Sequence, residues 1–366
     1  MSTHRNVRFT GNVFSNQRFG GVSRYVVELA SNLERVSDWS ASISAPLHIN
    51  EYLRERGRLG RHRGIYLAHR PPALAAINRF IEGWIRLRGS EGATVTHEIL
   101  YGFQNLKSFK GLKIATFYDM IHERFMPNEF VHRKKRMTID ASDHLVAISE
   151  ATKCDMVHFL DVDPDRIDVI YLASSMQPNG APVEGIPAGN YLLWVGSRRG
   201  YKNFECFSKA LANSRLWKGG FRLVCAGGPP PTPEERAAWE RIGLAAARVT
   251  HLQPNEQQLA SLYSHAALLV YASKFEGFGI PPLEAMNCGC PVAASSAGSI
   301  PEVVGDAACL FDPDDPNEMT HVMDKICESP SYRSELVTRG QLRASRFSWA
   351  RCASETLSMY RRLIGN

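Results

Sequence analysis

The sequence predicts an α/β protein made of two doubly wound domains, in which parallel sheets carry helices on both faces. Short apolar segments such as residues 267–271 (ALLVY) lack the polar alternation of a half-exposed strand and are typical of buried parallel strands. These segments alternate with helical patterns along the chain, an order that favours parallel sheets. The chain has 366 residues, of which 44% are hydrophobic, and this is enough to form two cores.

The domain boundary is expected in residues 174–189, a segment rich in Pro, Gly and Ser that is typical of a linker. It separates an N-terminal domain, residues 1–173, from a C-terminal domain, residues 190–345. Patterns in the first domain predict strands at 7–14, 41–45, 94–101, 112–118 and 144–149, and helices at 20–33, 72–89, 128–141 and 150–160. Those further on predict strands at 190–196, 221–226, 248–252, 267–271 and 292–295, and helices at 233–242, 255–264 and 348–364.

Two glycines, Gly20 and Gly21, lie between the first expected strand and the first expected helix. Backbone without a Cβ can approach a ligand closely, and the first N–H groups of a helix favour an anion. A tight turn without a ligand is the alternative. The G-x-G-x-x-G fingerprint is absent, which argues against a nicotinamide-dependent oxidoreductase on the same layered sheets.

Basic residues gather in two segments of the N-terminal domain. Residues 50–70 are rich in arginine and precede the amphipathic pattern of residues 72–89. This combination is compatible with contact with an anionic membrane surface, but the preferred interpretation is a solvated basic loop beside a helix packed on the sheet. The second segment, residues 133–136 (RKKR), is expected to form a solvated helix face.

Asp119 and His122 follow the expected strand 112–118. A polar group at the carboxyl end of a buried parallel strand points into the ligand crevice of such a sheet, although Asp119 could also be a helix N-cap. Residues 161–165 (DVDPD) contain a D-x-D pattern of the kind that holds a metal ion elsewhere. They lie between a helix and a strand, so no metal site is expected.

A basic turn follows the first strand of the C-terminal domain. Arg198, Arg199 and Lys202 lie where a phosphate group would meet a strand-to-helix turn. The alternative is a basic surface turn.

Residues 274–304 combine an anion cradle with carboxylates. Residues 277–279 (GFG) precede prolines that suit the first turn of a helix, which places free N–H groups beside the glycines. Glu276 and Glu284 repel phosphate but suit hydroxyl groups, because an ionised carboxylate accepts several hydrogen bonds. A ligand with phosphate in the middle and a sugar at each end fits, and this is a nucleotide sugar. The alternative is solvated surface charge.

The segment EGFGIPPLEAMNCGCPVAASSAGSIPEVVGDAACLFDP resembles the signature of retaining glycosyltransferases of family 4, the mannosyltransferase-like group 1 enzymes. The resemblance covers the second domain almost fully and the first in patches. It implies the GT-B architecture, in which two Rossmann-like domains face a central cleft. It also implies that the C-terminal helix, within residues 346–366, packs back on the first domain.

The resemblance also implies roles for individual residues. Glu276 would hold sugar hydroxyls near the reacting carbon, and Glu284 would hold the ribose. Lys202, with Arg198 or Arg199, would stabilise charge on the departing diphosphate. The other residues implied are Asp119 in catalysis, then Gly20, Gly21, Gly277, Phe278, Gly279 and Ser299 at the donor, and Arg24 and Tyr118 at the acceptor. His122 is a further acceptor-side candidate, which the resemblance does not imply.

One position departs from the family pattern. Relatives have a His-Asp pair where this chain has Tyr118 and Asp119. A phenol cannot carry the positive charge of a histidine, although it can donate a hydrogen bond. His122 does not match the family position, so the replacement for the histidine stays open.

The resemblance implies a retaining, metal-independent hexosyltransferase without a resident cofactor. Its motifs are similar to those of bacterial mannosyltransferases, so we expect transfer of mannose from GDP-mannose to a hydroxyl of a growing polysaccharide or lipopolysaccharide glycan, which can be lipid-linked. The alternatives are UDP-N-acetylglucosamine or UDP-glucose, a fucosyl or rhamnosyl donor, or a non-catalytic glycan-binding subunit.

Composition limits the partners and the location. The net charge of +6 suits an anionic ligand or membrane, and no nucleic-acid-binding motif accompanies it. The first residues carry no apolar signal region, and no run reaches 18 apolar residues. We therefore expect a cytoplasmic protein, and a peripheral position on the inner membrane face stays open.

Overall fold

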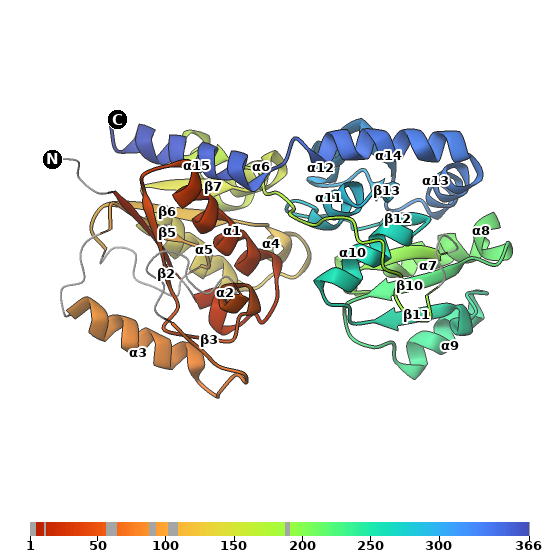
Figure 1. Cartoon of the computed structure of the whole chain (residues 1–366), viewed down its shortest axis with the longest axis horizontal. Helices are drawn as coiled ribbons and strands as arrows, with labels where there is room; N and C mark the ends of the chain where they lie inside the picture. Colours follow the sequence, from red (N-terminus) through yellow and green to blue (C-terminus); the bar gives the residue numbers. More distant parts are fainter. Residues whose placement is uncertain are drawn as a thin grey trace. The chain divides into compact units, whose positions relative to one another are not determined.

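The computed structural model describes residues 5–10, 12–55, 64–87, 93–101, 109–186 and 191–365. The chain divides into two compact units (Figure 1). The N-terminal unit holds Met1–Leu172 together with Trp349–Asn366, and the C-terminal unit holds Ala173–Ser348. Each unit contains a six-stranded sheet in which every described strand pair is parallel, so the predicted α/β class is confirmed.

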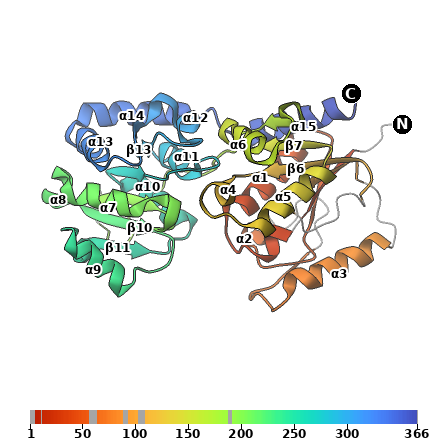
Figure 2. The same cartoon turned by 180° about the vertical axis from the view of Figure 1, so that it is seen from behind.

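The sheet of the N-terminal unit has the strand order β2-β1-β5-β6-β7-β8. Its strands are β1 (Asn6–Thr10), β2 (Ser40–Ser44), β5 (Val95–Glu98), β6 (Leu112–Phe117), β7 (His144–Ala147) and β8 (Ile167–Val169). A small second sheet pairs β3 (Leu47–His48) with β4 (Ile65–Tyr66). The helices are α1 (Gly21–Val36), α2 (Glu51–Glu55), α3 (Leu74–Leu87), α4 (Ile121–Phe125), α5 (Glu129–Ala141) and α6 (Glu150–Leu160). Helices α5 and α6 are seen most directly in Figure 2.

The first strand is shorter than predicted. It ends at Thr10, and a 3-10 turn, η1 (Asn12–Ser15), occupies the rest of the segment expected as strand 7–14. Val13 and Phe14 are adjacent in sequence and are both buried. A strand would place these neighbours on opposite faces of the sheet, whereas a helical turn can direct both into the core.

Helix α15 (Trp349–Leu363) packs on the N-terminal unit beside α1 (Figure 1), which confirms the expected return of the C-terminal helix. The Tyr360 hydroxyl lies 2.5 Å from Nδ1 of the buried His97, and the Tyr360 ring stacks on Trp39. Nε2 of His97 lies 2.7 Å from the Thr116 hydroxyl. The helix is therefore fixed to the centre of the sheet by polar as well as apolar contacts.

The sheet of the C-terminal unit has the order β11-β10-β9-β12-β13-β14. Its strands are β9 (Tyr191–Val195), β10 (Arg222–Ala226), β11 (Val249–Leu252), β12 (Leu268–Tyr271), β13 (Val292–Ser295) and β14 (Cys309–Phe311). The helices are α7 (Phe204–Asn213), α8 (Arg215–Lys218), α9 (Pro233–Arg241), α10 (Glu256–His265), α11 (Ile280–Asn287), α12 (Ile300–Val304), α13 (Pro316–Glu328) and α14 (Pro330–Ala344). The order of strands reverses beside β9, at the centre of the sheet.

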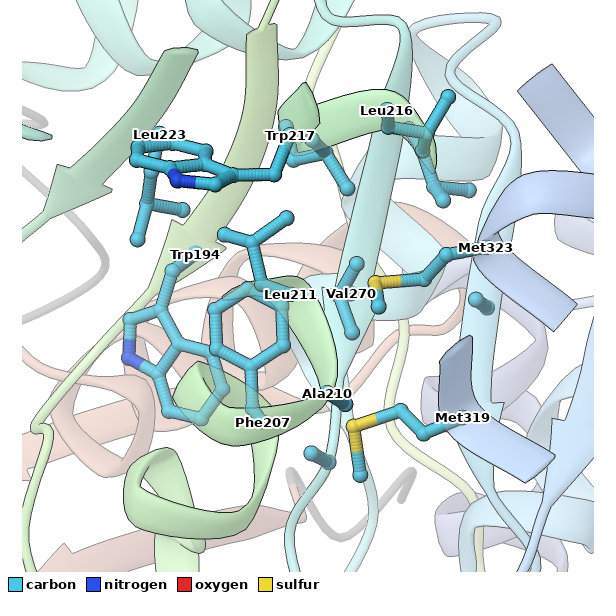
Figure 3. Close-up of a cluster of buried hydrophobic side chains, with 14 of the residues drawn as sticks. Trp194, Phe207, Ala210, Leu211, Leu216, Trp217, Leu223, Val270, Met319 and Met323 are labelled. Atoms are coloured by element: carbon cyan, nitrogen blue, oxygen red, sulfur yellow. The ribbon is translucent and has the colours of Figure 1, made fainter. Parts of the chain in front are cut away.

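One face of this sheet is covered by α7, α8 and α13, which contribute to a single apolar cluster. Figure 3 shows Phe207 and Leu211 of α7 beside Trp194, with Met319 and Met323 of α13 opposite. The Trp194 and Phe207 rings stack with centroids 5.1 Å apart. This packing fixes β9 and α7, between which the basic turn lies.

The segment predicted to be a linker, residues 174–189, is described as far as residue 186. The Asn179 backbone N–H donates a hydrogen bond of 3.1 Å to Ser264 Oγ, and the Asn179 side-chain amide donates to the Gln257 carbonyl at 2.9 Å. These contacts tie the segment to α10 of the C-terminal unit.

The prediction that residues 133–136 form a solvated helix face is wrong for Lys135, which is only 1% exposed. Its ammonium pairs with Glu123 of α4, a helix that the sequence analysis did not identify. None of the helices within the described residues is both long enough and apolar enough to cross a membrane.

Candidate functional site

The loops that follow β9 and β10 meet at the carboxyl edge of the C-terminal sheet. Gly196 follows β9 and Gly228 lies just after β10, and both have a positive φ. A Cβ on Gly228 would lie 3.0 Å from the Gly196 carbonyl oxygen. Because both glycines allow this approach, backbone groups from two neighbouring strands are placed beside the central crevice, where ligands of doubly wound sheets bind.

Lys202 and Glu276 come together at the same edge. Lys202 ends the short turn η4 (Gly200–Lys202), and its Nζ lies 2.7 Å from Glu276 Oε1. The two side chains are 19% and 10% exposed, so the pair is partly accessible to solvent. Such a pair can exchange partners, because a phosphate can replace the carboxylate at the lysine and sugar hydroxyls can replace the ammonium at the glutamate.

The loop that carries Glu276 is supported from beneath by Ser299. The Ser299 hydroxyl lies 2.8 Å from the Glu276 carbonyl and 2.9 Å from the Phe278 carbonyl, and it shares its single proton between them. A Cβ on the adjacent Gly298 would lie 3.1 Å from the Glu276 amide nitrogen. Ser299 is fully buried, so its position is that of a support for the loop.

Gly277, Phe278 and Gly279 lead into α11. Gly279 has a φ of 103° and precedes the first residue of the helix, so the turn requires glycine. Phe278 is 3% exposed and packs edge-on against Phe347. The side chain of Phe278 therefore anchors the loop.

Glu284 lies on α11 and is 6% exposed. The Tyr263 hydroxyl of α10 donates a hydrogen bond of 3.1 Å to its Oε2. Burial, together with the Glu284 charge, raises the pKa of Tyr263 well above its ordinary value, so the phenol keeps its proton. Tyr263 was not predicted from the sequence, because it lies in an ordinary helical pattern and no motif distinguishes it.

The two candidate arginines have different surroundings. Arg198 is 6% exposed, donates from Nη2 to the Pro229 carbonyl at 2.8 Å, and lies 3.4 Å from the Glu235 carboxylate. Arg199 is exposed. Arg198 thus braces the loop after β10, whereas Arg199 presents its side chain to solvent.

Gly20 and Gly21 form a packed turn at the start of α1. A Cβ on Gly20 would lie 2.4 Å from Gln17 Oε1, which also accepts a hydrogen bond from the Ser23 amide. Arg24 is 9% exposed and lies over the Tyr52 ring. A larger residue at position 20 would therefore displace the end of the Gln17 side chain from the Ser23 amide.

Asp119 follows β6, and its Oδ1 accepts a hydrogen bond of 3.0 Å from the Ile121 amide at the start of α4. The N-cap alternative is wrong, because Met120 is the N-cap residue of α4 and Asp119 precedes it. Lys135 Nζ donates to the Asp119 carbonyl at 2.9 Å and pairs with Glu123 at 2.7 Å. His122, the second residue of α4, is half-buried. The role of Lys135 was not predicted from the sequence, because a lysine within a basic run carries no signal of burial.

Tyr118 is 8% exposed, and its hydroxyl is buried without a hydrogen-bond partner among the described residues. Its ring contacts Tyr25 edge-on, with centroids 6.0 Å apart. Burial raises the pKa of Tyr118 well above its ordinary value, so this phenol stays neutral. Tyr118 therefore occupies the place of the family histidine as a core aromatic residue.

No cluster of three or more His, Cys, Asp or Glu side chains with the geometry of a metal site occurs within the described ranges. Asp163 and Asp165 of the D-x-D pattern belong to a turn, in which Asp163 Oδ1 accepts a hydrogen bond from the Asp165 amide.

Two family models match the chain. The model described as "Glycosyltransferase Family 4" matches residues 19–173, and the model described as "Glycosyl transferases group 1" matches residues 181–343. The two matches fall in the N-terminal and C-terminal units, respectively.

Several curated proteins are similar to the chain. The O-antigen chain mannosyltransferase B of Escherichia coli is 28% identical over 248 residues, which cover 64% of this chain and 64% of that protein. The MMP alpha-(1->4)-mannosyltransferase of Mycolicibacterium hassiacum is 29% identical over 239 residues, covering 64% and 57%. The chain spans less than two thirds of the length of these relatives.

Solved structures share the fold over nearly the whole chain. The sucrose-phosphate synthase of Thermosynechococcus elongatus has a TM-score of 0.74 at 18% identity, covering 99% of both chains. Anabaena Alr3699/HepE in complex with UDP and glucose has a TM-score of 0.72 at 17% identity, covering 97% of this chain and 100% of that one. At these identities the likeness shows a common fold.

Proposed function

We propose that this chain, which belongs to the family 4, group 1 glycosyltransferases and has the GT-B fold, transfers a hexose from a nucleotide sugar to a hydroxyl group of a glycan. The observation that carries the proposal is the Lys202–Glu276 pair at the carboxyl edge of the C-terminal sheet. A cation for phosphate and a carboxylate for sugar hydroxyls lie side by side there, next to backbone made accessible by glycines.

In this proposal each polar group of the C-terminal unit has one role. Lys202, assisted by the exposed Arg199, stabilises the charge that develops on the departing diphosphate, which is the kind of electrostatic stabilisation that contributes most to many enzymes. Glu276 holds hydroxyls of the transferred sugar, and Glu284 holds those of the ribose. The Tyr263 hydrogen bond fixes the Glu284 carboxylate in one orientation.

The N-terminal unit would bind the acceptor, with Asp119 as the principal polar group. We propose retention of configuration by a front-face reaction, in which the leaving phosphate accepts the proton of the acceptor hydroxyl. Such a reaction needs no metal ion and no second carboxylate of the glycosidase type. The acceptor would be a growing polysaccharide or lipopolysaccharide glycan.

The proposed donor is GDP-mannose, because several curated relatives are named as mannosyltransferases. A thermal-shift screen of GDP against UDP, dTDP and ADP tests this choice. A ligand at about 100 times its dissociation constant should add about 2.7 kcal/mol to the free energy of unfolding. Stabilisation by UDP alone would replace GDP-mannose by a UDP-sugar, and a chain that turns over no nucleotide sugar would contradict the enzyme assignment.

We further propose that the protein works in the cytoplasm as a peripheral partner of an anionic membrane. Helix α3 exposes Phe80 (77%) and Ile77 (41%), and it lies next in sequence to the arginine-rich segment, of which residues 56–63 fall outside the described part. Apolar side chains beside basic ones suit a membrane interface. Phe80→Ser should lower binding to phosphatidylglycerol vesicles, whereas the matched Phe130→Ser on α5 should not. Equal binding of both variants would contradict this role of α3.

A further inference from the structure

A buried carboxylate joins two loops of the N-terminal unit. Glu51 begins α2 and is 4% exposed. Its Oε1 accepts hydrogen bonds from Arg18 Nε at 3.0 Å and from the Tyr66 hydroxyl at 2.7 Å, while Arg18 Nη2 lies 2.9 Å away. Its Oε2 lies 2.9 Å from Arg54 Nε. Two guanidinium groups are therefore held against one carboxylate.

The backbone around these arginines is fixed as well. The Glu51 amide donates to the Arg18 carbonyl at 3.0 Å, and the Asn50 side chain donates to the Gln17 carbonyl at 2.8 Å. The Arg54 guanidinium lies 4.9 Å from the Tyr66 ring centroid. Both arginines are thus oriented before any ligand arrives, which lowers the entropy that binding would otherwise cost.

More positive charge gathers here than Glu51 can neutralise. One carboxylate balances one of the two guanidinium groups. Glu51 is contacted by Nε of both arginines and by Nη2 of Arg18. The side chains of Arg18 and Arg54 remain 59% and 53% exposed, respectively. One arginine would be enough to neutralise Glu51 and hold it in place. The second arginine at the same carboxylate leaves an excess positive charge and N–H donors that suit an anion.

The position of the cluster relates it to the sheet. Arg18 lies in the loop between η1 and Gly20, which follows β1, and α2 follows β2 and β3. Strands β1 and β2 are parallel neighbours, so their carboxyl ends lie at the same edge, where ligands of such sheets bind. Phe19 is 59% exposed and meets Tyr52 edge-on, so an aromatic surface of the kind that sugars pack against lies next to the arginines.

We propose that Arg18 and Arg54 form an anion subsite that binds a phosphate or carboxylate group carried by the acceptor. The identification of its ligand as the acceptor rests on the proposed function. The subsite makes the enzyme selective for acceptors that carry a negative charge close to the sugar that receives the hexose.

Mannose 6-phosphate and mannose are the probes, because they differ by one phosphate. Calorimetry should show at least about ten-fold tighter binding of mannose 6-phosphate to the wild type, as expected for charge-assisted hydrogen bonds. Arg18→Gln and Arg54→Gln should each remove most of this difference. Arg35→Gln, which changes an exposed arginine near the other end of α1, and Lys202→Ala, which removes the cation of the donor site, should preserve it.

Three outcomes would overturn the subsite. Equal affinities for mannose 6-phosphate and mannose would remove its basis, and so would folded Arg18→Gln and Arg54→Gln variants, with unchanged melting temperatures, that bind like the wild type. Loss of phosphatidylglycerol vesicle binding in Arg18→Gln, with mannose 6-phosphate binding intact, would assign the arginines to a lipid headgroup.

The same measurements separate the subsite from the proposed function. A wild type that binds no nucleoside diphosphate, but binds mannose 6-phosphate through Arg18, would contradict the glycosyltransferase proposal and support an anion site. Normal binding of nucleoside diphosphates, with no effect of Arg18 or Arg54 on mannose 6-phosphate, would remove the subsite alone.

Discussion

Each unit places a lysine–glutamate pair near the carboxyl edge of its sheet, and in both pairs the nitrogen–oxygen distance is 2.7 Å. The pairs differ in exposure. Lys135 and Glu123 of the N-terminal unit are 1% and 5% exposed, whereas Lys202 and Glu276 of the C-terminal unit are 19% and 10% exposed. A buried pair cannot exchange its partner for a ligand without leaving a charge unsolvated, so it holds structure, and a partly exposed pair remains available for binding.

The largest expected effect concerns Glu276. Glu276→Gln keeps the size of the side chain but removes the charge that we assign to the sugar, so turnover should fall by about 10²- to 10³-fold, as when one transition-state contact is lost elsewhere. Affinity for the nucleoside diphosphate should change little. Steady-state kinetics and calorimetry measure the two quantities. An unchanged turnover would show that the exposed pair is only structural, like its buried counterpart.

The buried pair should be seen in stability. Lys135→Met would leave the Glu123 carboxylate buried without its cation, so the free energy of unfolding should fall by about 3–5 kcal/mol in urea denaturation. Lys134→Met, the same change at the half-buried neighbouring position, should cost about 1 kcal/mol or less. If the two variants were equally stable, burial would not be what distinguishes the two pairs.

The identical substitution in the exposed pair should affect binding. Lys202→Met should weaken nucleoside diphosphate binding by about ten-fold or more, because a charge-assisted hydrogen bond to phosphate is lost. Its unfolding free energy should fall less than that of Lys135→Met, since the Lys202–Glu276 pair is closer to solvent than the Lys135–Glu123 pair. Full affinity in a folded Lys202→Met variant would argue against the donor site.

Acid should act on the N-terminal unit through His97. Burial lowers the pKa of His97 to about 3, whereas the unfolded chain binds this proton near pH 6.5. Between these values the unfolded state carries a proton that the folded state lacks, so stability falls as the pH falls. The loss from this group should be about 2 kcal/mol between pH 7 and pH 5. His97→Gln should show a smaller loss in urea denaturation at the two pH values, and an equal loss would contradict the assignment.

The smallest effect is expected at Tyr118. Because its buried hydroxyl has no partner in the described part of the chain, Tyr118→Phe should retain turnover and should change stability by no more than about 1 kcal/mol. A large loss of turnover would show that the phenol contacts substrate after all, as the family histidine is expected to do.

Much of the fold could be predicted because its signals are local. Apolar runs and helical patterns placed most strands and helices within a few residues, and the return of α15 followed from the family resemblance. The predicted end of β1 was wrong. Val13 and Phe14 are adjacent and both buried, and such a pair of apolar residues is compatible with a strand as well as with a helical turn. The short helix α4 was missed, since five residues carry too few apolar positions to show a period.

The candidate site divides in the same way. The motif around Glu276 and Glu284, the glycine turns and the basic turn with Lys202 could be found along the chain. The sequence could not show which arginine of that turn faces solvent, because Arg198 is buried by Glu235 and Pro229 from a different part of the chain. The position of Ser299 could not be predicted from the sequence either. Ser299 was expected at the donor, and it lies beneath the loop that carries Glu276.

The sequence by itself determined the class of fold, the order of its elements, the family and the residue types available at the sheet edges. These depend on periodicity, on glycine and proline positions and on short motifs, all of which act between residues close in the chain. Only the tertiary structure decided which charges are buried and which remain accessible. The burial of a long flexible side chain such as Lys135 or Arg198 is set by the atoms that distant segments place around it, and no local pattern contains that information.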